Sequence, residues 1–382
     1  MGQSKTVQEI NERIQRGEAV ILTAEEVSEM GKTSTPAEIF KKVDVVTTAT
    51  FGPMCSSGMF INTGHANPPI RMEQATLNGV PVCTGIAAVD LYIGATEVHP
   101  ENPAYGGAHV IEALIRGEDV DLVAHAKGTD CYPLKDVRTR INRENINEMI
   151  LFNPRNAYQN YPVAVNTSNK IKYTYMGSLL PRLGNANYST SGELSPLLND
   201  PELRTIGVGT RIFLAGTSGY VSWYGTQFKT AVEKNEHGVP VSNAATLSVI
   251  GDGRAMSTDF LKAAYFEKYG VSMFVGIGIP IPVLDEDMAR RVMIRNEQIT
   301  TRIIDYSDPD HPELGRTDYR ELMSGVLEFQ GKKIKTASMS SLYKARKIAG
   351  QLKEWIGSGH FLLSEPVQAF PQNKSLNSLE IR

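Results

Sequence analysis

Two cysteines lie in glycine-flanked, turn-like segments whose composition favours reactive thiols. Cys55 lies in Phe51-Gly-Pro-Met-Cys-Ser-Ser-Gly58, and Cys131 lies in Lys127-Gly-Thr-Asp-Cys-Tyr-Pro133. The chain has three cysteines, so a disulfide framework or a zinc ribbon lacks enough sulfur ligands. The chemistry to consider first is therefore that of free thiols.

The segment around Cys55 predicts an exposed turn that follows a strand. Gly52-Pro53 precedes the cysteine, and Ser56, Ser57 and Gly58 follow it. In such a turn, free backbone N–H groups and hydroxyls could stabilise a thiolate or bind a substrate anion. The alternative is a small buried hydrophobic residue, which most free cysteines are. The flanking glycines and proline favour the turn.

Cys131 is also predicted to lie in a turn, directly after Thr129 and Asp130. A carboxylate turned toward the sulfur would disfavour its thiolate, whereas one turned away could orient a proton donor or bind a substrate ammonium. The sequence leaves both open. Cys83 lies among apolar residues and is predicted to pack in the core.

Histidines in the same region raise the question of a metal site or a general base. His65, His99, His109 and His125 match no zinc-ligand spacing, so no metal is expected. His65 is the best candidate for an acid or base beside Cys55. A cysteine hydrolase would also need a third, orienting group, and no hydrolase motif surrounds His65.

Two arginines are candidates for holding a substrate carboxylate. Arg155, next to Asn156, and Arg211 lie in loop-rich or strand-edge segments where a guanidinium could form paired hydrogen bonds. The alternative for each is an ordinary surface ion pair.

Composition favours a small-molecule partner over nucleic acid or a membrane. The 382 residues carry a net charge of -3, with both signs interspersed. The N-terminus shows no export or transit pattern, and no apolar run approaches the ~20 residues that span a bilayer. Free thiols then indicate a reducing cytoplasm.

Periodicity and turn residues predict an α/β fold, with a mixed α+β arrangement as the variant. A single large domain, residues 1–356, would contain a mixed sheet and long functional loops, followed by a tail at 357–382. We expect helices at 6–17, 36–42, 108–116, 257–269 and 341–356. We expect strands at 19–23, 44–50, 90–95, 121–126, 172–176, 211–214, 220–224, 245–250 and 271–275.

Six segments in this order resemble the homocysteine biosynthesis protein family over roughly Val7 to Ile356. Two contain the cysteines, Phe51-Gly-Pro-Met-Cys-Ser-Ser-Gly58 and Gly128-Thr-Asp-Cys-Tyr-Pro133. The other four are Asn153-Pro-Arg-Asn-Ala-Tyr-Gln-Asn-Tyr161, Thr174-Tyr-Met-Gly177, Gly192-Glu-Leu-Ser-Pro-Leu-Leu-Asn-Asp200 and Arg204-Thr-Ile-Gly-Val-Gly-Thr-Arg-Ile-Phe213. One stretch departs from the family pattern, because Phe228 stands where relatives tend to place histidine.

The resemblance implies an L-aspartate semialdehyde sulfurtransferase, which forms L-homocysteine from L-aspartate 4-semialdehyde and a reduced sulfur source in anaerobes. The family's two motif cysteines align with Cys55 and Cys131. It implies no bound cofactor but an external reductant, with a small ferredoxin-like iron-sulfur protein as partner, and we expect a homo-oligomer. The nucleotide-sensing CBS modules of archaeal relatives do not follow residue 356, so we expect no regulation through them.

Two thiols suit this chemistry if they can meet. One would carry sulfur as a persulfide or hold the aldehyde as a thiohemiacetal, and the other would release the product and leave a disulfide. Cys55 is expected to face the substrate, and bridging requires Cα atoms within ~7 Å. The alternative of another class is a thiol-based redox or metal sensor without turnover.

Overall fold

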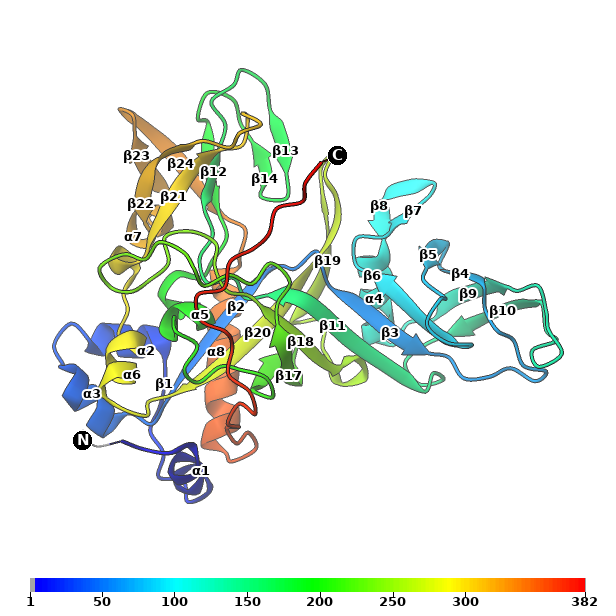
Figure 1. The fold of residues 1–382 in the computed structure, drawn as a ribbon, viewed down its shortest axis with the longest axis horizontal. Helices are drawn as coiled ribbons and strands as arrows, with labels where there is room; N and C mark the ends of the chain where they lie inside the picture. The colour runs from blue at the N-terminus through cyan, green and yellow to red at the C-terminus, as the bar shows by residue number, and fades with distance from the viewer. Residues whose placement is uncertain (1–3, 382) are drawn as a thin grey trace.

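The computed structural model describes residues 4–381. Figure 1 shows a central body, a lobe above it and an arm that extends to one side. The body is built on a ten-stranded sheet, the lobe on a six-stranded sheet and the arm on a four-stranded sheet. The predicted mixed α/β class is confirmed.

The central sheet holds most of the functional segments. Its strand order is β1-β2-β20-β16-β17-β18-β11-β3-β6, with β19 paired to β20. β1 and β2 are parallel and the other pairs are antiparallel, so the sheet is mixed. The strands are β1 (Ile21–Thr23), β2 (Val45–Pro53), β3 (Gly58–Asn62), β6 (Asp90–Gly94), β11 (Glu148–Asn156), β16 (Arg211–Leu214), β17 (Thr217–Tyr224), β18 (Leu247–Asp252), β19 (Leu261–Phe266) and β20 (Gly270–Pro282).

The first and last helices begin at capping residues, close to the predicted positions. Thr6 and Glu9 form a capping box before α1, and Ser341 caps the last helix. The helices are α1 (Val7–Gln15), α2 (Ala24–Met30), α3 (Pro36–Lys42), α4 (Gly107–Arg116), α5 (Pro196–Asn199), α6 (Glu286–Val292), α7 (Tyr319–Met323) and α8 (Leu342–Gly357), with short 3-10 turns η1 (Gly192–Leu194), η2 (Gly253–Ala255) and η3 (Asn296–Gln298).

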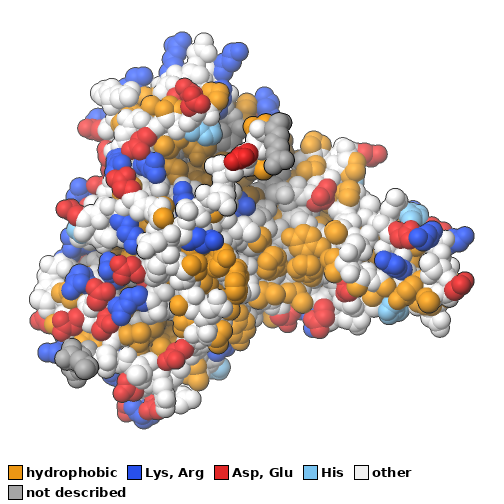
Figure 2. All heavy atoms as spheres, viewed as in Figure 1, with side chains coloured by type: hydrophobic (Ala, Val, Ile, Leu, Met, Phe, Trp, Pro, Cys, Tyr) orange, Lys and Arg blue, Asp and Glu red, His pale blue; other side chains and the backbone are white. Residues whose placement is uncertain are grey.

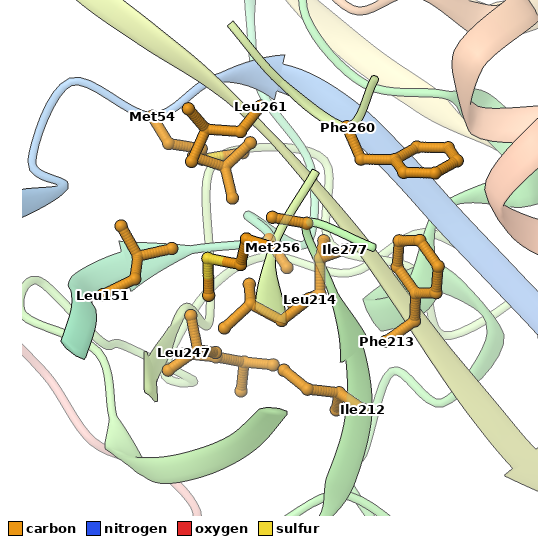
Figure 3. Packing of buried hydrophobic residues seen from close by; sticks show 14 of the residues in the cluster. Met54, Leu151, Ile212, Phe213, Leu214, Leu247, Met256, Phe260, Leu261 and Ile277 are labelled. Atoms are coloured by element: carbon orange, nitrogen blue, oxygen red, sulfur yellow. The ribbon is translucent and has the colours of Figure 1, made fainter. Parts of the chain in front are cut away.

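α8 packs closely on the central sheet because β20 carries two glycines at the contact. A Cβ atom at Gly276 would lie 2.7 Å from Ile348 Cδ1, and one at Gly278 would lie 3.0 Å from Ile348 Cγ2. Figure 3 shows the adjoining core, where Phe213 meets Phe260 edge-to-face with ring centroids 5.1 Å apart. This core makes the sheet a rigid base for the loops at its edges.

The lobe and the arm have their own strands. In the lobe these are β12 (Val163–Val165), β15 (Asn185–Tyr188), β21 (Thr300–Asp305), β22 (Glu313–Asp318), β23 (Val326–Phe329) and β24 (Lys332–Ser338), with the hairpin β13 (Lys172–Thr174) and β14 (Gly177–Leu179). In the arm they are β4 (Gln74–Leu77), β5 (Val80–Val82), β9 (Val120–His125) and β10 (Asp136–Ile141), and the hairpin β7 (Val98–His99) and β8 (Asn102–Gly106) lies near them in Figure 1.

One predicted helix is wrong. Residues 257–269 have helix-forming Leu, Lys and Ala, but Leu261–Phe266 forms β19 and pairs with β20 along its whole length. Cross-strand pairing outweighs the weak local helix propensity here. The segment after α8 lies on the body, with Phe361 and Phe370 buried.

Among residues 4–381, no helix is both long and apolar enough to cross a bilayer.

Candidate active site

Cys55 occupies the tip of a tight turn between β2 and β3, as predicted. The carbonyl of Met54 accepts hydrogen bonds from the backbone N–H of Ser57 at 3.0 Å and from its hydroxyl at 2.7 Å. Asn153 of β11 donates to the same hydroxyl at 2.6 Å. Ser57 is therefore a buried clamp for the turn, while Cys55 and Ser56 at its centre remain half-exposed.

Gly58 is needed where the turn enters β3. It pairs with Gly94 of β6, and a Cβ atom at Gly58 would collide with the ring of Tyr92. A Cβ atom at Gly94 would meet nothing within 4 Å.

We expect Gly58→Ala to lower the free energy of unfolding by about 1–3 kcal/mol through overpacking. Gly94→Ala, its partner in register, is the matched control and should change it much less. Chemical denaturation of both variants checks this. Equal losses would show that Tyr92 moves aside at no cost.

A cavity of about 330 Å³ opens at Cys55, where the body meets the lobe. This volume suits a small metabolite. Its lining is Thr50, Pro53, Met54, Cys55, Ser56, Arg155, Ala157, Tyr158, Tyr161, Tyr175, Met176, Ser189, Thr190, Ser195, Pro196, Gln227, Phe266, Tyr269, Ser272 and Ser340.

Tyrosines form one wall of this cavity. The ring centroids of Tyr158 and Tyr161 lie 5.1 Å apart, and Tyr175 lies 6.1 Å from Tyr161 and 6.2 Å from Tyr269. The hydroxyl of Tyr161 donates to that of Tyr175 at 2.9 Å, and Tyr175 bonds Tyr306 at 2.7 Å. Burial raises the pKa of Tyr158 and of Tyr161, so both phenols stay protonated and can donate hydrogen bonds.

Arg155 is the positively charged side chain in the lining of the cavity. Its Nε donates to the hydroxyl of Thr226 at 3.1 Å. Within the described residues, no other charged side chain lines the cavity. The buried hydroxyl of Ser272 also lines it and has no hydrogen-bond partner among residues 4–381. The cavity is thus suited to an anionic, hydrogen-bonding ligand.

Asn156, predicted to bind substrate, is fully buried beside the cavity and is not part of its lining. Its side-chain amide has no partner in the described part of the chain, whereas its backbone carbonyl accepts from the hydroxyl of Thr246 at 3.0 Å.

The structure places Cys131 in the arm, outside the cavity. Thr129 and Tyr132 exchange backbone hydrogen bonds of 2.9 and 3.1 Å, so Asp130 and Cys131 form the exposed tip of a turn. The prediction of a turn is confirmed, but one chain does not bring the two thiols into the same cavity.

His65 belongs with Cys131 and not with Cys55, so its predicted place beside Cys55 is wrong. Its ring stacks on Tyr132 with centroids 6.1 Å apart. β3 separates the two turns: Cys55 precedes Gly58, and His65 follows Asn62. Four residue steps of a strand, at ~3.3 Å each, cover ~13 Å before either flanking loop begins.

Arg211 lies outside the cavity and fastens the C-terminal segment. Its guanidinium lies 4.3 Å from the centroid of the Phe361 ring and donates to Ser218 at 2.9 Å. Its backbone N–H donates to the hydroxyl of Ser364 at 2.7 Å. These contacts make it a structural residue.

Cys83 is exposed, so its predicted core position is wrong. Its backbone exchanges two hydrogen bonds of 2.9 Å with Tyr92 at the edge of the central sheet. An isolated bridge at a sheet edge leaves the thiol outside, although its sequence neighbours are apolar.

The tyrosine wall was missed because its members are distant in sequence. Tyr158 and Tyr161 follow β11, Tyr175 lies in the lobe, and Tyr269 lies between β19 and β20. A signal was present: three of these four lie in the segments that carry the family resemblance.

Comparison with known proteins places the chain in a family of sulfur-incorporating enzymes. Residues 19–363 match the family described as "Homocysteine biosynthesis enzyme, sulfur-incorporation", and the chain belongs to that family. A protein of Methanosarcina acetivorans named L-aspartate semialdehyde sulfurtransferase is 46% identical over 98% of this chain and 74% of its own length. One of the same name from Methanocaldococcus jannaschii is 46% identical over 98% of this chain and 75% of its own. No solved structure matches the chain.

Proposed function

We propose that the chain is an L-aspartate semialdehyde sulfurtransferase that forms L-homocysteine with Cys55 as the substrate-facing thiol. The observation that carries this is the position of Cys55, half-exposed in a cavity that residues of the family segments line and that has, among residues 4–381, a single cation. The names of the two relatives give the substrate and the reaction class.

The cavity offers a partner for each end of the substrate that it must bind. Arg155 would hold the α-carboxylate, since a guanidinium pairs well with two oxygens. The backbone N–H groups of Cys55 and Ser56 have no acceptor among the described residues. They would donate to the oxygen of the aldehyde as Cys55 adds to it.

The reaction also needs two electrons. One aldehyde and one hydrogen sulfide give one thiol and one water when two electrons and two protons are added. Two cysteine thiols supply both as they form a disulfide. We propose that sulfur enters as sulfide and that Cys131 is the second thiol. Sulfur delivered as a cysteine persulfide would need two further electrons, which the external reductant would supply.

Reducing the disulfide of Cys55 and Cys131 back to two thiols requires two electrons from an external reductant. We propose an iron-sulfur protein of ferredoxin type as the reductant, with no cofactor bound in the chain itself, and a reducing cytoplasm as the compartment. Three exposed or half-exposed free thiols are consistent with that setting.

Replacing Arg155 by alanine should raise KM for aspartate semialdehyde about 10- to 100-fold, since a charge-assisted contact is worth ~1.5–3 kcal/mol. Arg155→Lys should recover part of this loss. Arg211→Ala is the control and should leave KM unchanged, because it lies outside the cavity. Steady-state kinetics measure KM for the three variants. A normal KM for Arg155→Ala would mean that another residue binds the α-carboxylate.

The direct test is anaerobic turnover by purified protein. Aspartate semialdehyde, sulfide and a chemical reductant should yield homocysteine at a rate proportional to enzyme. Stoichiometric zinc or iron on the protein with no homocysteine formed would instead support a thiol-based sensor.

A further inference from the structure

The cavity of one chain lacks two groups that the proposed reaction uses. Within the described residues its lining has one thiol, and it has no carboxylate to face the substrate ammonium. Both missing groups lie together on one turn of the arm, where Asp130 and Cys131 are exposed at the tip. The question is how that turn could reach Cys55.

An apolar face lies between the two turns. Cross-strand pairing aligns Tyr92, Phe60 and Ile150 in one row across β6, β3 and β11. The next row aligns Phe152, Ile250 and Tyr220 across β11, β18 and β17. With Trp223, these seven side chains are the "apolar face".

The apolar face is continuous and unlike the other side of the same strands. The ring of Phe60 lies 4.8 Å from Tyr92 and 6.2 Å from Phe152, centroid to centroid. On the opposite side, Met59 and Ile61 are fully buried in the core.

The face is also open. Tyr220 is 47% and Trp223 is 44% exposed, and none of the seven carries a charge. Figure 2 shows hydrophobic side chains gathered over β3, β6 and β11, between the body and the arm. A patch of this kind on a central sheet marks an interaction surface.

The position of the face between the two turns indicates what covers it. β3 crosses the face, with the Cys55 turn at its start and the segment that leads to His65 and the Cys131 turn after its end. A two-fold axis can lie parallel to the sheet and perpendicular to β3. Rotation about this axis packs the apolar face of one copy against the apolar face of another. That operation exchanges the two ends of β3, so the arm of each copy lies over the cavity end of the other.

Charge agrees with this pairing. Arg155 is the one charged side chain lining the cavity within residues 4–381, whereas the arm turn carries the exposed carboxylate of Asp130. The rim of the cavity at Arg155 adjoins the face, because the carbonyl of Pro154, next to Arg155, accepts from the N–H of Thr226 just after β17. The carboxylate of Asp130 would thus approach the guanidinium of Arg155.

We propose that a second copy of this chain docks on the apolar face and completes the active site with its own Asp130 and Cys131. The inference rests on the proposed function for the roles of the two groups. Asp130 of the second copy faces the substrate ammonium. The thiols of Cys55 and of Cys131 of the second copy form an intermolecular disulfide as their two electrons and two protons pass to the carbon-sulfur group of the product. An iron-sulfur protein reduces that disulfide.

Association is the first test. Sedimentation velocity of the full chain should show a dimer, and Tyr220→Asp should shift it to monomer, because a carboxylate would then be buried in the contact. Tyr343→Asp, at a 74% exposed position on α8, is the matched control and should remain dimeric. A monomeric wild type, or a Tyr220→Asp variant that stays dimeric, would overturn the docking.

Thiol geometry is the second test, and it does not depend on turnover. In a Cys83→Ser background, mild diamide oxidation should give a covalent dimer on a non-reducing gel, with a linked Cys55–Cys131 peptide. Cys55→Ser or Cys131→Ser added to that background should abolish the band. A linked peptide found only within the monomer band, or no linked peptide, would contradict the proposal.

Mixing the two inactive variants is the third test. After subunit exchange at equal amounts, Cys55→Ser and Cys131→Ser should recover about one quarter of wild-type activity, because half of the dimers are mixed and each has one intact site. No recovery would mean that both thiols act within one chain. If the wild type forms no homocysteine, the proposed function fails, while sedimentation and oxidation still decide the docking.

Discussion

Replacing Cys55 by alanine is expected to abolish homocysteine formation, with a loss in kcat on the order of 10³-fold or more, as for other covalent nucleophiles. Cys55 is the one thiol that lines the cavity within the described residues, so no other thiol of the same chain can substitute for it. Anaerobic steady-state kinetics of the purified variant give the result.

The matched control is Cys83→Ala. Cys83 is also an exposed thiol, but it lies at the edge of the central sheet and outside the cavity. Its removal should leave kcat unchanged. Activity retained by Cys55→Ala, or lost only in Cys83→Ala, would remove the basis for assigning the reaction to this cavity.

Replacing Cys131 by alanine is expected to block turnover but not substrate binding. We expect kcat to fall on the order of 10²-fold or more, because Cys55 alone cannot form the disulfide that supplies the two electrons. The Kd for aspartate semialdehyde should remain that of the wild type, because Arg155 and Asp130, which are proposed to hold the charged groups of the substrate, are unchanged.

Equilibrium binding and single-turnover experiments separate the two effects. Cys131→Ala should still form an adduct on Cys55 and should fail to release product. Unchanged steady-state turnover would contradict the two-thiol scheme. A large rise in Kd would mean that Cys131 contributes mainly to substrate binding and not to the reduction step.

Local structure could be predicted where it depends on near neighbours in the chain. The capping box of Thr6 and Glu9 sets the start of α1, and the glycines around Cys55 and Cys131 do indicate turns, because each turn is closed by a hydrogen bond between residues three positions apart. The same reasoning predicted a helix at residues 257–269, where pairing with β20 decides the structure.

The assembly of the site could be predicted only in part. Cys55, Ser56 and Arg155 meet as expected, since β3 and β11 are neighbours in the sheet. His65 and Arg211 were placed wrongly, because their positions depend on the path of the arm and on the C-terminal segment. The tyrosine wall depends on contact between the lobe and the body, which no local pattern reports.

Anaerobic peptide mass spectrometry, after incubation of the protein with sulfide and aspartate semialdehyde, tests the central claim most directly. We expect the added mass, that of the substrate aldehyde, on the peptide that contains Cys55. Mass added to Cys83 or Cys131 while the Cys55 peptide stays unmodified would contradict it.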